Sequence, residues 1–345
     1  MKNNVYVHIS LTLLGIMAGG IVIAWLIFSN QPLEIFPALS VQKITELKKE
    51  TARVAVLNFG DIMLDRSVKA ALTRGLNPFE KVVSPDGDWF WPADLVAANL
   101  EGPISDYRPC PDKSIKFTFD PSTAGLLARS SFDLLNLANN HIYDCTSQAI
   151  RDTEKHLADN GLSFFGSPLS GGQYTIKEVS GKKILFFGIN MFGFETRRLD
   201  EVYDTIAALD KINDYTIVHI HWGDEYVPKP TTEQVQIAHT LIDSGADAII
   251  GHHPHVVQPV EIYNYRPIFY SLGNFVFDQP WPDTKVGIGA GLIFGDPEML
   301  VNIFPYNIVS YQPTLMSQSN AIEFCNKLLT DLVERDGCSF KIRFH

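Results

Sequence analysis

The sequence is poor in cysteine and in basic residues, and both shortages exclude classes of function. Only four of its 345 residues are cysteine, and no two form a C-x-x-C pair, which argues against a thiolate-bound zinc site. The 28 lysines and arginines are outnumbered by 39 acidic residues, so the net charge is −11. Such a chain does not hold nucleic acid by a general electrostatic field. A polyanionic substrate would likewise have to be held by metal ions and a few local bases.

Internal repeats and low-complexity tracts are also missing. With 46% hydrophobic and 19% charged residues, the composition is that of an ordinary globular protein. The length allows one large domain or two.

Charged residues are absent from Ile9–Phe28, a stretch whose length matches the thickness of a bilayer core. We expect a transmembrane anchor at residues 9–28 that follows a short cytoplasmic segment, because Lys2 precedes the stretch and no base follows it before Lys43. A signal peptide cleaved near Ser40 and a buried core helix are the alternatives. With an anchor or a signal peptide, the rest of the chain lies outside the cytoplasm, and with an anchor it stays at the cell membrane.

The four cysteines fit that location, where disulfides form and persist. Cys325 and Cys338 flank a short C-terminal helix and turn, whereas Cys110 and Cys145 each follow a candidate site motif. Pairing within these two sets is the simplest of the three possible connectivities. Free buried thiols are the alternative.

The organisation after the anchor predicts a linker over residues 29–52 and one domain over residues 53–345. Strand-like and helix-like segments alternate up to about residue 255, which favours the α/β class. The helices are expected at Ser147–Asn160 and Thr232–Asp243, and a β-hairpin at residues 173–189. Beyond residue 255 the predicted strands are closely spaced, and we expect them to form a second sheet that packs face to face with the first. These strands are residues 256–263, 267–272, 287–294, 300–304 and 308–312.

Polar side chains suited to metal binding follow a series of short apolar runs, which are typical of strands buried on both faces. An α/β fold presents its chemistry at the carboxyl ends of such strands. The most informative run is residues 247–258, DAIIGHHPHVVQ, where three histidines fall within four residues. A surface histidine cluster is the alternative for this segment alone. The ligands expected from the whole series are Asp61, Glu101, Asn140, His221, His253 and His255.

This mixed set of oxygen and nitrogen donors suits Zn, Mn or Fe better than Ca or Mg. Glu101 could bridge two divalent metal ions. Two such ions can hold both the attacking and the leaving oxygen of an in-line displacement. His141 is predicted to protonate the leaving group, with Asp144 orienting its imidazole.

Other roles are open for some of these residues. Asp61 and Asp144 could each cap a following helix. His219 alternates with His221 along one strand and is expected in the core, and His252 is expected behind the ligands.

Six ordered motifs together resemble the CapA family, which is associated with capsule and poly-γ-glutamate biosynthesis and is similar to the calcineurin-like metallophosphoesterases. The resemblance covers about residues 53–280 and implies a four-layer αββα sandwich with a dinuclear metal site. It carries over the six ligands named above, with His141 as the acid. The motifs are GDIML from Gly60, NLEG from Asn99, ANNH from Ala138 with Asp144, HWGDEY from His221, GHHPHV from Gly251 with Gln258, and YSLGNF from Tyr270 with residues 277–279.

One motif departs from the wider group, where the first motif usually reads D-x-H. Here Met63 takes the place of the histidine, and a thioether is a poor ligand for a hard ion. We therefore expect one of the two metal positions to be weaker, differently ligated or empty. The second carboxylate is Glu101 in place of the usual aspartate.

The substrate is expected to be a phosphoester or an anionic polymer. Arg108, Lys113 and Lys116 lie in one loop and could meet a phosphate or a γ-linked carboxylate, although solvated loop charges are the alternative. Asn274 is a further candidate for substrate binding.

Three functions follow from these expectations. The first is a membrane-anchored metal-dependent hydrolase of phosphoester type. The others are a non-catalytic, metal-binding subunit of a capsule polymer synthesis and export complex, and an amide hydrolase that trims poly-γ-glutamate. The expected partners are the membrane and other capsule-synthesis subunits, not nucleic acid.

Overall fold

A computed structural model describes most of the chain after residue 52, and every described residue belongs to one compact unit, Ala38–His345. The expected anchor at residues 9–28 and the expected linker lie outside the described residues. Within the described part, no helix has the length and apolar character needed to cross a membrane. The described residues are 53–83, 93–106, 110–111, 114–169, 171–193, 198–330 and 335–343.

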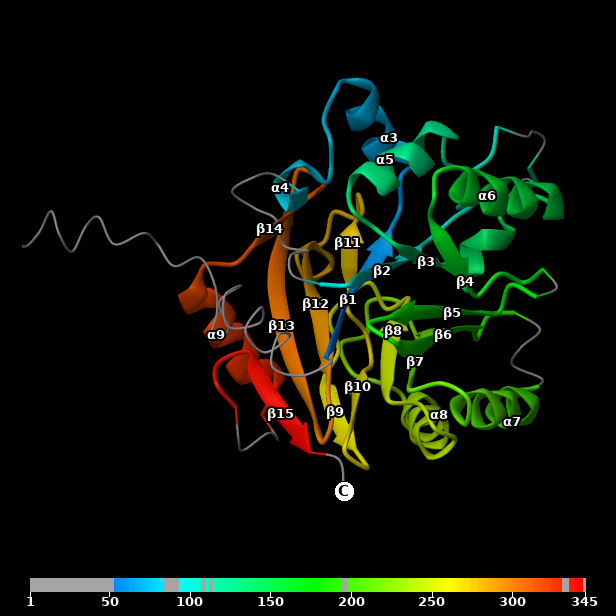
Figure 1. Cartoon of the computed structure of the whole chain (residues 1–345). Helices are drawn as coiled ribbons and strands as arrows, with labels where there is room; N and C mark the ends of the chain where they lie inside the picture. Colours follow the sequence, from blue (N-terminus) through cyan, green and yellow to red (C-terminus); the bar gives the residue numbers. More distant parts are fainter. Residues whose placement is uncertain are drawn as a thin grey trace, which may run out of the picture. The chain divides into compact units, whose positions relative to one another are not determined.

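The larger of two β-sheets runs in the order β14-β13-β12-β1-β2-β3-β4, with β11 paired to β1 and β15 to β13 (Figure 1). β1, β2, β3 and β4 are parallel neighbours, whereas β12 pairs antiparallel with β1. The strands are β1 (Val54–Ile62), β2 (Leu95–Leu100), β3 (Leu134–Asn136), β4 (Ser163–Phe165), β11 (Asn274–Val276), β12 (Val286–Phe294), β13 (Glu298–Val309), β14 (Gln312–Leu315) and β15 (Ser339–Arg343).

The smaller sheet has the order β5-β6-β7-β8-β10-β9. β5 and β6 form the hairpin expected from the sequence, and both turn residues, Ser180 and Gly181, have positive φ (53° and 76°), as a two-residue turn between twisted strands requires. The strands are β5 (Tyr174–Val179), β6 (Lys182–Asn190), β7 (Tyr215–His221), β8 (Ala248–His252), β9 (Val260–Tyr263) and β10 (Arg266–Phe269).

Helices cover the outer face of each sheet, and an apolar core fills the space between the sheets. α3 (Arg66–Thr73), α5 (Ser122–Arg129) and α6 (Ser147–Asp159) pack on the larger sheet. α7 (Leu199–Asp210) and α8 (Thr232–Asp243) pack on the smaller one, as Figure 1 also shows. The inner core joins residues of both sheets, including Val56, Phe186 and Leu292. The shorter elements are α4 (Glu80–Val83), α9 (Gln318–Leu328), and the 3₁₀ helices η1 (Asn140–Tyr143) and η3 (Asp283–Lys285).

The α/β class and both expected helices, α6 and α8, agree with the sequence analysis. α8 has the expected bounds, because Thr231 and Gln234 form a capping box at its start. α6 begins at the expected residue and ends one residue early. All four cysteines are oxidised in the expected pairs, Cys110–Cys145 and Cys325–Cys338.

The expected origin of the second sheet is wrong. The strands beyond residue 255 divide between the two sheets, because β9 and β10 extend the smaller sheet while β11–β15 complete the larger one. Two strands were expected at residues 300–304 and 308–312. The first of these and the start of the second instead form one strand, β13, which ends at Val309. Pro305 does not interrupt it, since its carbonyl still accepts the Met316 N–H. Strand pairing of this range is set by distant partners, which a local pattern does not contain.

Candidate metal centre

The carboxyl ends of strands from both sheets meet at one place, and four of the expected ligands lie there. Asp61 lies near the end of β1, and Glu101 follows the last residue of β2. His221 ends β7, and His253 directly follows β8. A hydrogen bond joins the strand ends of the two sheets at this point, because the His253 backbone N–H donates to the Asp61 carboxylate at Oδ2 over 3.3 Å.

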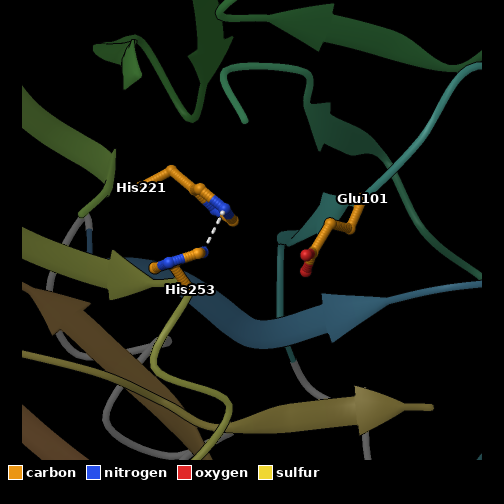
Figure 2. A group of neighbouring side chains, drawn as sticks. All are labelled: Glu101, His221 and His253. Atoms are coloured by element: carbon orange, nitrogen blue, oxygen red, sulfur yellow. Dashed lines mark hydrogen bonds between the residues drawn. The ribbon is translucent and has the colours of Figure 1, made fainter. Parts of the chain in front are cut away.

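Glu101 is shared by two groups of side chains whose ligand atoms lie close enough to hold a metal ion. One group is Glu101, His221 and His253, and Figure 2 shows the carboxylate facing the two imidazoles. The other group is Glu101, Asp61 and His255. All five side chains are buried. A carboxylate common to two ligand groups is what the predicted bridging role requires.

Both carboxylate oxygens of Glu101 are buried and have no hydrogen-bond partner. Burial, followed by the neighbouring charges of Asp61 and Glu225, raises the pKa of Glu101 well above its usual range. Leaving a buried polar group without a partner is costly. This orphaned carboxylate therefore fits a divalent cation, and it is the strongest sign in the described residues that the site holds one.

Asp61 has the opposite electrostatic setting. Burial by itself raises its pKa, but the contacts with His252 and His255 outweigh that effect and hold the pKa well below the usual value. The distances are 3.4 Å from Oδ1 to His252 Nδ1 and 3.2 Å from Oδ2 to His255 Nδ1. Asn99 also donates to Oδ1, at 2.8 Å. Asp61 is thus kept ionised, as a metal ligand must be.

His221 and His253 are kept neutral, which leaves each a ring nitrogen able to bind a metal. Burial lowers the pKa of His221 well below its usual value, and burial lowers that of His253 to about 3. His253 and His255 also have positive φ, 95° and 58°, a region that side chains other than glycine rarely adopt. Such backbone strain is typical of functional loops.

Asn140 also contacts this group, because its Oδ1 lies 2.9 Å from His221 Nε2. It begins η1, where the preceding Asn139 caps the helix through the Ile142 N–H. All six expected ligands therefore lie in one cluster, and their role as ligands stays a prediction.

The predicted acid and its orienting partner are adjacent to the ligands. His141 Nδ1 lies 2.6 Å from Asp144 Oδ2, and His141 Nε2 lies 3.8 Å from Glu101 Oε1. Asp144 also accepts the Phe117 N–H at 2.8 Å. The imidazole is thus fixed from one side, with its other nitrogen facing the carboxylates.

The alternative capping roles are wrong. The N-cap of α3 is Asp65, not Asp61, and the N-cap of α6 is Thr146, not Asp144. Both Asp61 and Asp144 are instead buried in contact with histidines.

A chain of buried polar groups supports Asp61 from behind. His219 lies between the sheets, as expected, and its Nε2 contacts Asn58 Oδ1 at 3.1 Å. Its Nδ1 lies 3.0 Å from His252 Nε2. His252 in turn contacts Asp61, so it lies behind the ligands as the sequence predicted.

Met63 takes no part in the ligand groups. Its side chain is fully buried in the apolar core of the larger sheet's outer face, and its sulfur accepts the Asp65 N–H at 3.1 Å. The position of the usual histidine is therefore filled by core packing, and any ion near Asp61 relies on the other ligands.

The expected substrate-binding residues have different placements. Arg108 and Lys113 lie outside the described residues. Lys116 is exposed and donates to the Pro111 carbonyl at 3.3 Å. Asn274 is fully buried, contacting His255 Nδ1 at 2.9 Å and donating to Gln279 Oε1 at 2.8 Å. These contacts make Asn274 a support for His255, and its contact with substrate stays a prediction.

A cavity of about 370 Å³ opens beside the centre and is lined in part by His141 and His255. It brings in three charged residues that the sequence analysis did not select as site residues, Arg66, Glu225 and Asp278. Glu225 forms a third possible ligand group with His253 and His255. Its place in the HWGDEY motif was a usable signal, whereas nothing local in the sequence pointed to Arg66.

The donors fit a divalent metal ion. Glu101, His221 and His253 would hold one position, and Asp61, Glu101 and His255 a second. When bound, divalent metal supplies Lewis-acid polarisation of the scissile bond and lowers the pKa of water.

Comparison with known proteins places the chain in a family. Residues 55–279 match the family model described as "Bacterial capsule synthesis protein PGA_cap". The chain belongs to this family. The resemblance to the CapA proteins is therefore confirmed over the part of the chain that carries the six motifs.

Of two Bacillus relatives, one is named for PGA biosynthesis and the other for capsule biosynthesis. The chain is 36% identical over 246 residues to the "PGA biosynthesis protein CapA" of Bacillus subtilis, and 32% identical over 269 residues to the "Capsule biosynthesis protein CapA" of Bacillus anthracis. The matches cover 66% and 69% of this chain, and 64% and 63% of those proteins. The chain thus spans less than two thirds of either relative's length.

More distant matches extend over more of the chain. A "probable polyglutamine synthesis accessory protein" of Mycobacterium tuberculosis is 26% identical over 358 residues, covering 84% of this chain and 93% of that protein. Among solved structures, a purple acid phosphatase from yellow lupin is 10% identical with a TM-score of 0.34, over 85% of this chain and 54% of that one. That likeness is too low to carry an argument.

Proposed function

We propose that this member of the family is a metal-dependent hydrolase that acts in the synthesis of a capsule polymer of the poly-γ-glutamate type. The single observation that carries the proposal is the Glu101 carboxylate, buried without a hydrogen-bond partner and shared by two ligand groups. A buried carboxylate that accepts no hydrogen bond is costly to desolvate, and the nearest imidazole nitrogens, of His255 and His141, lie 3.6 Å and 3.8 Å from Oε1, too far for a hydrogen bond. Two divalent transition-metal ions, of the Zn, Mn or Fe kind, would compensate that cost.

The protein's own residues would position substrate and move one proton. Asp144 accepts from Nδ1 of His141, which leaves Nε2 of that ring to donate a proton to the leaving group. The 3.8 Å separation of Nε2 from Glu101 Oε1 supports this role, because a substrate held at the ligands would lie within reach of the ring. The Phe117 N–H fixes Asp144, and the Phe117 ring lies 4.2 Å from the imidazole.

Two bond classes suit such a centre: a phosphoester, which the similarity to the metallophosphoesterases implies, and the γ-amide of the polymer. Metal content and turnover of the purified full-length protein test the proposal together. We expect bound divalent transition metal, and hydrolysis of an aryl phosphate or of a γ-glutamyl anilide that stops when a chelator removes the metal. A protein that holds no metal after growth with Zn, Mn and Fe would refute the proposal.

The proposal also includes the cellular location of the domain. We propose a single-pass anchor at residues 9–28 with the domain outside the cytoplasm, and the two disulfides support it because they form in oxidising compartments. Protease added to intact cells should then degrade the domain. Full protection of the domain, or a soluble chain shortened near Ser40, would contradict the anchor.

A second function, a non-catalytic subunit of the polymer-synthesis complex, is favoured by two observations. The Mycobacterium relative is named as an accessory protein, and Met63 fills a usual ligand position with core packing. Metal binding without turnover of any phosphoester or γ-amide, together with co-purification of other capsule-synthesis subunits, would support this second function over the first.

A further inference from the structure

The cavity beside the metal centre contains charges of both signs. Among the described residues that line it, Arg66 supplies a guanidinium, while Glu225 and Asp278 supply carboxylates. Its volume of about 370 Å³ lies within the range of small-molecule sites. A ligand that fits here must match a cation and carboxylates within one small space.

Arg66 is held in a fixed position. Its guanidinium carbon lies 4.9 Å from the centre of the Phe117 ring and 5.7 Å from that of Phe277, and the group forms an ion pair with Asp278. The Arg66 side chain is nevertheless 40% exposed, so part of the guanidinium stays open to the cavity. A planar guanidinium fixed by aromatic faces suits a carboxylate, which it can bind through two N–H groups.

The backbone at Arg66 is also unusual. Its φ of 49° lies in the left-handed region at the very start of α3. The Asp65 side chain accepts the Arg66 N–H at 2.8 Å, and Asp278 Oδ2 accepts the Ser67 N–H at 3.1 Å. Strain of this kind persists where surrounding contacts over-determine it, typically at functional sites.

The lining also includes Glu225 and two exposed aromatic rings. Tyr226 is 41% exposed and Trp281 is 52% exposed, and their ring centres lie 4.7 Å apart. An ammonium group is attracted both by a carboxylate and by aromatic faces. Glu225 and the two rings therefore suit a cation, whereas Arg66 suits an anion.

We propose that this cavity binds the free α-amino acid end of a substrate, with the α-carboxylate on Arg66 and the α-ammonium against Glu225 and the Tyr226–Trp281 pair. Because Asp278 already offsets Arg66, the three charged residues leave the lining with one net negative charge. A zwitterion, which carries one charge of each sign, is well matched to a lining that presents both.

This inference deepens the proposed function and rests on it in one respect, that the cavity and the ligands serve the same substrate. In a chain of γ-linked glutamates, only the amino-terminal residue carries a free α-amino group beside its α-carboxylate. The cavity would therefore select the end of such a polymer over its interior.

Three small compounds, L-glutamate, glutarate and 4-aminobutyrate, separate the proposed carboxylate contact from the proposed ammonium contact. Glutarate is glutamate without the α-amino group, and 4-aminobutyrate is glutamate without the α-carboxylate. In calorimetric titrations of the purified full-length protein, we expect L-glutamate to bind at least about tenfold more tightly than either probe, because each lacks one charge-assisted contact. Equal binding of the three compounds, or no binding of any at millimolar concentration, would overturn the proposal.

Two variants assign the contacts. Arg66→Gln should weaken glutamate about tenfold to a hundredfold and leave 4-aminobutyrate unchanged. Glu225→Gln should weaken glutamate and 4-aminobutyrate while sparing glutarate. Arg151→Gln and Glu233→Gln, which change exposed residues away from the cavity, are the matched controls and should leave all three affinities unchanged.

The measurement also separates this proposal from the proposed function. Glutamate can chelate a bound ion directly, and such binding would survive Arg66→Gln, which would overturn the cavity assignment. Selective binding in a protein that hydrolyses nothing would uphold the cavity and refute the hydrolase. The melting temperature and the metal content of each variant are measured alongside, as controls for an intact fold and an intact metal centre.

Discussion

His141 Nδ1 and Asp144 Oδ2 lie 2.6 Å apart, both residues are buried, and His141 lines the cavity. The Phe117 N–H donates to the same carboxylate oxygen, so Asp144 is fixed by the loop that precedes α5. The adjacent residue, Cys145, is joined to that loop by the disulfide with Cys110. The geometry of the predicted acid is therefore set by contacts between segments that lie far apart in the chain.

The first prediction concerns His141 as the general acid. His141→Ala should lower turnover about 10²- to 10⁴-fold while metal content stays close to that of the wild type. The loss should shrink for substrates with good leaving groups, because these need no proton. Steady-state rates on a series of aryl phosphates, with metal analysis, check this. Loss of metal in the variant would make His141 a ligand, and full activity would end its catalytic assignment.

The second prediction concerns the ligands. The double substitution His253→Ala with His255→Ala removes a nitrogen donor from each of the two ligand groups and should abolish most bound transition metal. Elemental analysis of the purified protein measures it. His239→Ala is the control, because His239 contacts Glu261 on the outer side of the smaller sheet and should leave the metal content unchanged. An unaltered metal stoichiometry in the double variant would refute the ligand assignment.

The third prediction concerns Glu101 and pH. Burial raises the pKa of Glu101 in the metal-free fold. Its contribution to the free energy of unfolding is therefore fully present below the unfolded pKa of about 4.3 and is lost as pH rises from there through the folded pKa. In metal-free protein at pH 7, Glu101→Gln should therefore be more stable than wild type, by about 1–3 kcal/mol. The difference should vanish near pH 4.

Urea unfolding of chelated samples across this pH range measures the effect. Adding metal should reverse the order, since the variant lacks the shared carboxylate. A metal-free variant less stable than wild type at pH 7 would show that Glu101 has a compensating partner in the fold.

The fourth prediction concerns the disulfides. Cys110–Cys145 closes a loop with a sequence separation of 35 residues, and Cys325–Cys338 one of 13 residues. Loop entropy gives each a stabilising effect of about 2–4 kcal/mol, with the longer loop contributing about 1 kcal/mol more. Unfolding free energies of the two paired Cys→Ser variants test this order. Mass mapping that finds four free thiols in the native protein would contradict the pairing.

The sequence by itself determined the family and the strand ends that carry the expected ligands. It could do so because these features are local. For the cysteines it only favoured one of three pairings, and the folded structure decided between them. An apolar run that ends in Asp61 or Glu101 predicts both a buried strand and a side chain at its edge, whatever the neighbouring strands are. The GHHPH loop likewise carries its chemistry within five residues.

Tertiary structure alone decided which strands share a sheet and what lines the cavity. β12 became a neighbour of β1, and β13 ran through Pro305, because long-range pairing and burial set these outcomes. Arg66 entered the site because Asp278 and Phe277, more than 200 positions away in sequence, hold it there. The orphaned state of Glu101 is decided in the same way. A residue type shows that a carboxylate is present, but only the packed fold determines whether any donor reaches it.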